Sequence, residues 1–148
     1  MVTALGEPFN YGAGHQATDL RRLFARIARA LRPGSRFIFD VIIHEGEPMN
    51  HRTWRVGPDW AVLVEVSEDR RRRTLARHII TFRTVDGRIR RSEEQHTVQC
   101  FRRAELERAL RVPGFTFRVS RRYGRMPLAP RRLAFIATKP TLPAQARR

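Results

Sequence analysis

Hydrophobic residues near the N-terminus follow first the period of a helix and then that of a buried strand. Thr18 is placed to cap a helix, and Asp19 follows in its first turn, where a carboxylate suits the positive end of the helix dipole. Apolar residues then recur three and four positions apart, at Leu20, Leu23, Phe24, Ile27 and Leu31. Residues 32–34 (RPG) end the helix, and the apolar run 37–43 (FIFDVII) is typical of a strand buried on both faces. With Val2–Leu5 as a preceding strand, the pattern is that of a βαβ unit.

From about residue 52 the pattern changes to longer segments in which apolar and polar residues alternate. The alternation predicts half-exposed antiparallel strands at 60–67, 74–85 and 88–101. Asp86-Gly87 is typical of a tight hairpin, and the run EDRRRR is interpreted as a solvated hairpin loop. A helix is predicted at 103–111, followed by strands at 115–124 and 132–139 that flank a loop. The residues from Pro140 onward are expected to be a disordered tail.

Charge is the most conspicuous feature of the composition. The 148 residues contain 30 Lys and Arg, of which only Lys139 is a lysine, and the formal net charge is +16. Such a charge attracts phosphate backbones through counterion release. An almost pure arginine surface is also what compositional bias produces at solvated positions. We favour compositional bias, and expect any nucleic-acid binding to be non-specific.

Several other classes of function receive no support from the sequence. Cys100 is the single cysteine, so no internal disulfide forms, and no Cys/His cluster has the spacing of a zinc site. No apolar run approaches the length of a membrane span, and the first residues lack the pattern of a signal peptide. The sequence therefore favours a single-domain, soluble, cytoplasmic protein without a metal site.

The order of these elements resembles the C-terminal half of class I S-adenosylmethionine-dependent methyltransferases. The segment VTALGEPFNY is similar to the fourth strand of that family and the loop after it. LFARIARALRPGSRFIFDV is similar to the next helix and the fifth strand, and RYGRMPLAPRRLAFIATKP to the end of the domain. The resemblance implies an α/β fold: a truncated Rossmann-like sheet, strands four to seven, with an inserted antiparallel meander. It places a partial methyltransferase domain at 1–140, with the insertion at about 52–101, and a tail at 141–148.

In that family the cofactor binds at the carboxyl ends of the parallel strands. The family's glycine-rich turn and ribose-binding acid belong to strands before the fourth, and neither is found in these 148 residues. The segment YGAG at 11–14 lacks a third glycine and a following helix, which favours a plain loop. The sequence is therefore interpreted as a methyltransferase fragment whose unaided activity and binding of S-adenosylmethionine are doubtful. The alternatives are a non-catalytic remnant, a basic binding module and one half of a split enzyme.

The resemblance also implies positions for the site. Leu5, Gly6 and Glu7 are expected to border the methionine part of the cofactor. The small-molecule methyl acceptor is expected to contact residues of the same loop, the fifth strand and the insertion, namely Asn10, Tyr11, Asp40, Trp54, Trp60 and Tyr123. Weak candidates for a catalytic base are Glu65, His78 and His96. For the tryptophans the alternative is packing, for the histidines a surface position, and for Asp40 a cap on the next turn.

The resemblance makes a definite prediction about the sheet. Val2–Leu5 should form an exposed edge, open to a missing N-terminal half or to a second copy of the chain. The helix at 18–32 should pack on the strand at 37–43, and Leu133–Thr138 should pair beside that strand. The last two strands should be antiparallel to each other.

Overall fold

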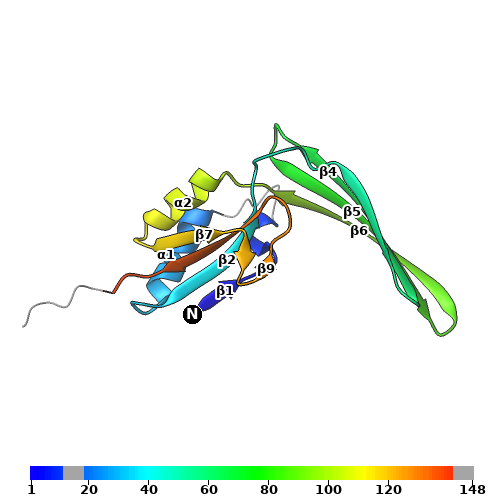
Figure 1. The fold of residues 1–148 in the computed structure, drawn as a ribbon, viewed down its shortest axis with the longest axis horizontal. Coiled ribbons are helices and arrows are strands. Elements are labelled where there is room, and N and C mark those ends of the chain that lie inside the picture. Colours follow the sequence, from blue (N-terminus) through cyan, green and yellow to red (C-terminus); the bar gives the residue numbers. More distant parts are fainter. Residues whose placement is uncertain (12–18, 142–148) are drawn as a thin grey trace, which may run out of the picture.

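The computed structural model describes residues 1–11 and 19–141, which form a helix-covered body and a long β arm (Figure 1). The body contains a four-stranded sheet in the order β1-β2-β10-β7. Its strands are β1 (Val2–Ala4), β2 (Arg36–Ile42), β7 (Thr116–Ser120) and β10 (Arg132–Thr138). The arm is a second four-stranded sheet in the order β3-β4-β5-β6. Its strands are β3 (His51–Val56), β4 (Trp60–Asp69), β5 (Thr74–Val85) and β6 (Arg88–Gln99).

The body sheet has the strand pairing that the sequence predicts. β1 runs parallel to β2, and Val2 pairs with Phe37. β10 lies antiparallel between β2 and β7, with Phe135 opposite both Phe39 and Val119. Within the described residues β1 has β2 as its one neighbour, so β1 is an edge strand. The expected edge, the position of Leu133–Thr138 beside β2 and the antiparallel final strands are confirmed.

Helix α1 (Leu20–Ala30) begins one residue later than the capping pattern suggested. Asp19 is the N-cap residue, not a member of the first turn, because its carboxylate accepts hydrogen bonds from the backbone N–H groups of Arg21 and Arg22. Thr18, the predicted cap, lies outside the described residues. Lys139 donates to the carbonyls of Ala28 and Leu31 and so satisfies the other end of the helix.

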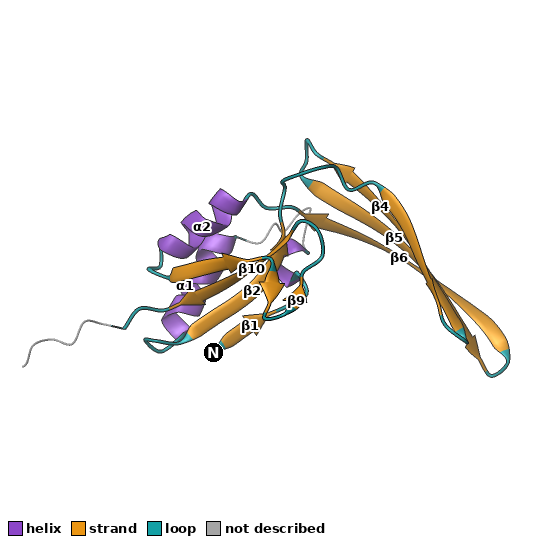
Figure 2. Cartoon of the chain, viewed as in Figure 1, coloured by secondary structure: helices purple, strands orange, loops and turns teal. Residues whose placement is uncertain are grey.

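The core of the body lies between its sheet and the two helices α1 and α2 (Arg103–Arg111), which pack on the same face (Figure 2). The packing of α1 against β2 is confirmed. Phe24 on α1 is fully buried against Phe37 and Phe39 of β2. The rings of Phe39 and Phe135 stack with centroids 5.1 Å apart. Leu106 and Leu110 of α2 complete this layer.

The arm confirms the predicted antiparallel meander and adds a strand that the sequence pattern did not indicate. Asp86 and Gly87 form a two-residue turn, both with positive φ (52° and 70°), as this hairpin type requires. Residues 70–73 form the hairpin turn between β4 and β5, and residues 57–59 connect β3 to β4. The sequence did not predict β3. All six of its residues are exposed, so the strand has no buried face that would require apolar residues at alternate positions. A small hairpin, β8 (Arg122–Tyr123) and β9 (Met126–Pro127), also lies in a segment predicted partly as loop.

Buried polar contacts attach the arm to the body. Arg131 forms a two-point ion pair with Glu68 of β4 (2.5 and 2.9 Å) and donates to the carbonyl of Ile43. The hydrogen bonds from Arg131 lower the pKa of the Glu68 carboxyl group to about 2. Cys100 lies in the small apolar cluster at this junction, where burial raises the pKa of its thiol to about 11. The thiol is therefore not a nucleophile at neutral pH.

The described residues contain no group of side chains arranged to hold a metal ion. None of the helices in this part of the chain is long and apolar enough to cross a membrane. Apart from Thr141, the predicted tail at 141–148 lies outside the described residues.

Candidate functional site

A polar cluster occupies the carboxyl ends of β1 and β2. Asp40, in β2, is almost completely buried. Its Oδ1 atom accepts a hydrogen bond from the backbone N–H of Gly6 (2.7 Å) and another from the hydroxyl of Tyr123 (3.2 Å). Burial and the neighbouring Asp40 carboxylate raise the pKa of Tyr123, so its hydroxyl stays protonated and donates. Gly6, Asp40 and Tyr123 thus meet in space, although Asp40 and Tyr123 are 83 positions apart in the sequence.

Glu7 lies between two arginines in the same cluster. Its backbone is in the left-handed region (φ 59°), and its side chain is only 5% exposed. Oε1 accepts from Arg77 Nη1 of the arm (2.5 Å), while Oε2 forms an ion pair with Arg132 of β10. Arg132 Nε also lies 3.6 Å from Asp40 Oδ2. The loop after β1 is therefore held by ion pairs to both the body and the arm.

Tyr11 and His96 extend this cluster along the inner face of the arm, the face that carries Arg77. Tyr11 forms a bridge to Val98 of β6, and its ring meets that of His96 edge to face with centroids 5.9 Å apart. The hydroxyl of Tyr11 lies 3.5 Å from Arg77 Nη1. His96 Nε2 lies 2.8 Å from Glu94 Oε2. His96 is thus the histidine candidate that contacts a residue of the loop after β1.

Asn10 has no exposed surface, and its side-chain amide contacts backbone groups. It donates to the carbonyls of Ile42 (3.0 Å) and Gln99 (2.5 Å), and its Oδ1 accepts from the N–H of Ile42 (3.0 Å). Asn10 therefore joins the body sheet to the last strand of the arm. In this geometry it holds the loop in place and does not present its amide to an acceptor.

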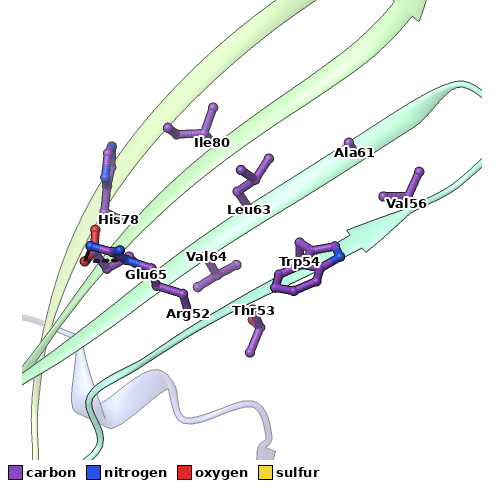
Figure 3. Close-up of a pocket in the computed structure, with 10 residues that line it drawn as sticks. All are labelled: Arg52, Thr53, Trp54, Val56, Ala61, Leu63, Val64, Glu65, His78 and Ile80. Carbon is purple, nitrogen blue, oxygen red and sulfur yellow. Dashed lines mark hydrogen bonds and ion pairs between the residues drawn. The ribbon is translucent and has the colours of Figure 1, made fainter.

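Trp54, Glu65 and His78 lie on the opposite, outer face of the arm, away from Arg77 and His96. Strand pairing establishes this face. Arg52 lies opposite Glu65, and Glu65 lies opposite His78; Trp54, two residues after Arg52 in β3, points to the same side. A groove of about 490 Å³ lies on this face. Figure 3 shows the residues that line it: Arg52, Thr53, Trp54, Val56, Ala61, Leu63, Val64, Glu65, His78 and Ile80. Glu65 is paired with Arg52 (2.7 Å) and His78 with Glu93 (2.6 Å). The structure therefore does not bring Glu65, His78 or Trp54 together with the cluster around Asp40.

Trp60 lies on the inner face near the far end of the arm. Its indole packs so closely on Gly57 that a Cβ at that glycine would overlap the ring nitrogen. The Gly57 N–H also donates to the carbonyl of Trp60 (2.8 Å). These contacts agree with the packing alternative for this tryptophan.

The sequence did not indicate Arg77 and Arg132 as members of the cluster. Both are arginines in a chain that contains many others, and nothing adjacent to them distinguishes them. A usable signal was the position of Arg132 at the first residue of the strand beside β2. Its pairing with Ile42 directs it to the end of the sheet where Asp40 lies.

The two carboxylates of the cluster differ in how far they are satisfied. Glu7 Oε2 is paired with Arg132, whereas Asp40 Oδ2 is buried 3.6 Å from Arg132 Nε and accepts no hydrogen bond from any described residue. Leu5 is 56% exposed beside them, and a Cβ at Gly6 would meet no atom within 4 Å, so the loop is open on that side. A ligand that donates a hydrogen bond, such as the amino group or a hydroxyl group of S-adenosylmethionine, would complete the hydrogen bonding of Asp40 Oδ2.

Comparisons with known proteins give the fold. No protein-family model matches the sequence, and a search of curated proteins also found no match. Among solved structures, an S-adenosylmethionine-dependent methyltransferase from Clostridium acetobutylicum is similar with a TM-score of 0.74 and 17% identity. The alignment covers 94% of this chain and 57% of that protein.

Two sugar methyltransferases are similar with slightly lower TM-scores. CalS10, an amino pentose methyltransferase from Micromonospora echinaspora, has a TM-score of 0.69 at 16% identity, covering 93% of this chain and 57% of CalS10. KedS8, a sugar N-methyltransferase from Streptoalloteichus, has a TM-score of 0.69 at 17% identity, covering 95% of this chain and 56% of KedS8. The chain thus spans less than two thirds of the length of these proteins. Its fold is that of part of an S-adenosylmethionine-dependent methyltransferase, as the resemblance in the sequence implied.

Proposed function

We propose that this chain forms the substrate-side half of an S-adenosylmethionine-dependent methyltransferase acting on a small molecule. The glycine-rich part of the cofactor site would come from residues outside these 148, in a longer polypeptide or in a separate chain. The observation that carries the proposal is the cluster of Gly6, Glu7, Asp40 and Tyr123 at the carboxyl ends of two parallel strands. Cofactors of open α/β sheets bind at this edge.

The similar structures and the open edge of β1 support the proposal. Each of the three methyltransferases is matched over most of this chain but over little more than half of its own length. The outer edge of β1 has no strand beside it among the described residues. A sheet can be extended at such an edge by hydrogen bonding to a further strand.

Each residue of the cluster has a proposed role. Leu5, Gly6 and Glu7 border the methionine part of the cofactor, and the ion pairs of Glu7 hold that loop in place. Tyr11, Asp40 and Tyr123 contact the methyl acceptor. His96 receives the acceptor's proton, because a neutral imidazole that donates from Nε2 to Glu94 keeps its lone pair on Nδ1.

Bound cofactor supplies a methyl group on a positively charged sulfur that is already a good leaving group. The protein then has to align the acceptor with that methyl group and to take up the acceptor's proton. The residues of this chain would divide these two tasks: Tyr11, Asp40 and Tyr123 would hold the acceptor, and the imidazole of His96 would take up its proton.

The proposal is tested by sequencing the DNA upstream of the Met1 codon and by producing the longest in-frame polypeptide. We expect it to contain a strand, a glycine-rich turn and a helix, and to bind S-adenosylhomocysteine with micromolar affinity in titration calorimetry. If the longer polypeptide or a neighbouring gene product with such a turn fails to bind this product together with residues 1–148, the proposal is wrong.

The role of His96 is tested in the same preparation with radiolabelled S-adenosylmethionine and a panel of small amines and alcohols. We expect His96→Asn to lower methyl transfer about 100-fold or more, in line with the usual contribution of a general base. His78→Asn is the matched change, because both histidine side chains are 34% exposed but His78 lies on the outer face. Equal losses in the two variants would contradict the assignment of the base.

A further inference from the structure

An unused hydrogen-bond acceptor and an unused donor face each other inside the polar cluster. Asp40 Oδ2 and Arg132 Nε lie 3.6 Å apart. Both atoms are buried, and neither forms a hydrogen bond with any of the described residues. Because buried polar atoms are normally hydrogen-bonded, two unpaired ones side by side indicate a place for a bound polar group.

The other polar atoms of these two side chains already have partners. Asp40 Oδ1 accepts hydrogen bonds from the N–H of Gly6 and the hydroxyl of Tyr123. The guanidinium group of Arg132 forms an ion pair with Glu7 Oε2. Each side chain is thus anchored through its other atoms, which keeps Asp40 Oδ2 and Arg132 Nε apart.

The gap between the two atoms suits one bridging atom. A separation of 3.6 Å is too long for a direct hydrogen bond, but an oxygen about 2.8 Å from each atom contacts both. That oxygen has to accept from Arg132 Nε–H and donate to Asp40 Oδ2. A hydroxyl group does both, whereas an ammonium group has no lone pair and a carboxylate has no hydrogen to donate.

The charges around the gap favour the same kind of group. Glu7 forms ion pairs with Arg77 and Arg132, and Arg132 also lies beside Asp40, so two carboxylates meet two guanidinium groups. An added ammonium or carboxylate group would be buried without a counterion, which is costly. The net charge of +16 on the whole chain favours anions, so selection of a neutral group would be a property of this cluster.

The gap is open to a ligand from the side of Arg132. The side chain of Arg132 is 24% exposed, whereas that of Asp40 is only 1% exposed. The adjacent loop is also open, because Leu5 is exposed and a Cβ at Gly6 would meet no atom within 4 Å. A ligand that enters beside Arg132 therefore approaches the gap along the surface of this loop.

We propose that Asp40 and Arg132 bind a hydroxyl group of an uncharged small molecule, whose oxygen bridges Oδ2 and Nε. The two residues thereby determine specificity, because they select a neutral group over an ammonium or a carboxylate group at this position. The assignment of that molecule as the methyl acceptor rests on the proposed function, whereas the hydroxyl site itself does not.

Three compounds that carry different groups on the same ring test the site. Cyclohexanol, cyclohexylamine and cyclohexanecarboxylate are each titrated into the 148-residue chain without cofactor, and NMR follows the signals of the Gly6 amide and Arg132 Nε–H. We expect cyclohexanol to shift both signals with millimolar affinity, as its size of about seven heavy atoms allows. The two charged compounds should bind at least about tenfold more weakly.

Two substitutions should change the preference in opposite directions. Asp40→Asn puts a donor where the free acceptor was and leaves an excess positive charge, so cyclohexanecarboxylate should bind at least about tenfold more tightly than to the wild type. Arg132→Met removes the donor and leaves an excess negative charge, so cyclohexylamine should gain by a similar factor. The Gly6 amide reports binding in both variants.

Glu65→Gln and Arg52→Met are the matched controls. They make the same two charge changes in an exposed ion pair on the outer face of the arm. Both should leave the affinities for all three compounds unchanged, and circular dichroism should show every variant folded as the wild type.

The wild-type chain alone can overturn the proposal. If cyclohexanol does not shift the Gly6 amide, or if the three compounds bind equally, Asp40 and Arg132 form no hydroxyl site. A wild-type preference for the carboxylate would also contradict it, because the charge of the whole chain would then decide. The calorimetry with S-adenosylhomocysteine contains none of these compounds, so failure of the proposed function is seen separately from failure of this site.

Discussion

The body and the arm are both built on four-stranded sheets, but they bury very different amounts of apolar surface. In the body, Phe24, Phe37, Phe39 and Phe135 are fully buried between the sheet and two helices. Along the arm, the strands are exposed or half-buried except near the body, where Val66, Leu75 and Val98 are buried. The body is therefore stabilised by its core, whereas the arm depends on strand pairing and on its contacts at the junction.

This difference explains the distribution of the candidate site. The polar cluster lies where the two regions meet, and it uses ion pairs from Arg77 of the arm and Arg132 of the body to hold one loop. A rigid body fixes Asp40, while the arm supplies the residues on the other side. The predictions below test whether the two regions differ in this way, beginning with the largest effect.

The largest effect is expected from removing a ring in the body core. Phe39→Ala should lower the free energy of unfolding by about 4 kcal/mol, because it removes buried surface and leaves a cavity. Ile80→Ala in the arm should lower it by less than about 1 kcal/mol, since that side chain is already partly exposed. Urea denaturation at low protein concentration measures both. Equal losses in the two variants would show that the arm has a core of its own.

The next effect concerns the junction and depends on pH. The pKa of Glu68 is lowered from 4.5 to about 2 by its hydrogen bonds to Arg131, and its side chain has no exposed surface. A lowered pKa stabilises the folded state above pH 4.5, and this stability is lost as the pH falls towards 2. The lowering of the pKa from 4.5 to about 2 corresponds to about 3 kcal/mol of folding stability.

Glu68→Gln removes this titration, so its unfolding free energy should change less between pH 5 and pH 2.5 than that of the wild type. Glu65→Gln is the control, because Glu65 is 47% exposed in its pair with Arg52. Urea titrations at several pH values provide the measurement. An unchanged acid profile in Glu68→Gln would mean that another carboxylate controls acid unfolding.

A smaller effect is expected at Asn10, which links the two sheets. Asn10→Ala removes the side-chain hydrogen bonds to the N–H of Ile42 and the carbonyl of Gln99, whereas the carbonyl of Ile42 still accepts from the N–H of Phe101. Unsatisfied buried groups of this kind cost about 2 kcal/mol. Hydrogen exchange followed by mass spectrometry should show faster exchange in β6 near Gln99 and little change in β10. Uniformly faster exchange would indicate that Asn10 supports the whole fold and not the junction.

The smallest effects concern the arginines, which occur in both regions. We expect binding to nucleic acid to be non-specific and to weaken steeply with salt. Arg118→Ala in the body and Arg90→Ala in the arm should each weaken it by a similar small factor, as fluorescence anisotropy with unrelated DNA sequences would show. A strong sequence preference, or the loss of binding from one substitution, would indicate a dedicated recognition surface.

Local sequence patterns predicted the elements whose burial is regular. The helical period of the apolar residues from Leu20 to Leu31 identified α1, because that helix buries one stripe of side chains. The apolar run at 37–43 identified β2, because that strand is buried on both faces. β3 could not be predicted, since it is a strand only through its pairing with β4. Helix capping was misplaced by one residue because Thr18 and Asp19 are both good capping types.

The candidate site was predictable where it follows the strand ends and not where it depends on the arm. Gly6, Glu7 and Asp40 lie together because parallel strands end at one edge of the sheet. Which face of the arm each residue occupies depends on strand register, and that separates His96 from Glu65 and His78. No local signal marked Arg77, which long-range packing selects from many arginines. For Arg132, the usable signal was its place at the start of the strand predicted to lie beside β2.

The central claim, that these residues form only the substrate-side half of a methyltransferase site, is tested most directly by titration calorimetry. The measurement is the binding of S-adenosylhomocysteine to the 148-residue chain and, in parallel, to the longer or complemented protein. We predict no measurable binding to residues 1–148, which contain no glycine-rich turn, and micromolar binding once that turn is supplied. Micromolar binding to the 148-residue chain itself would contradict the account.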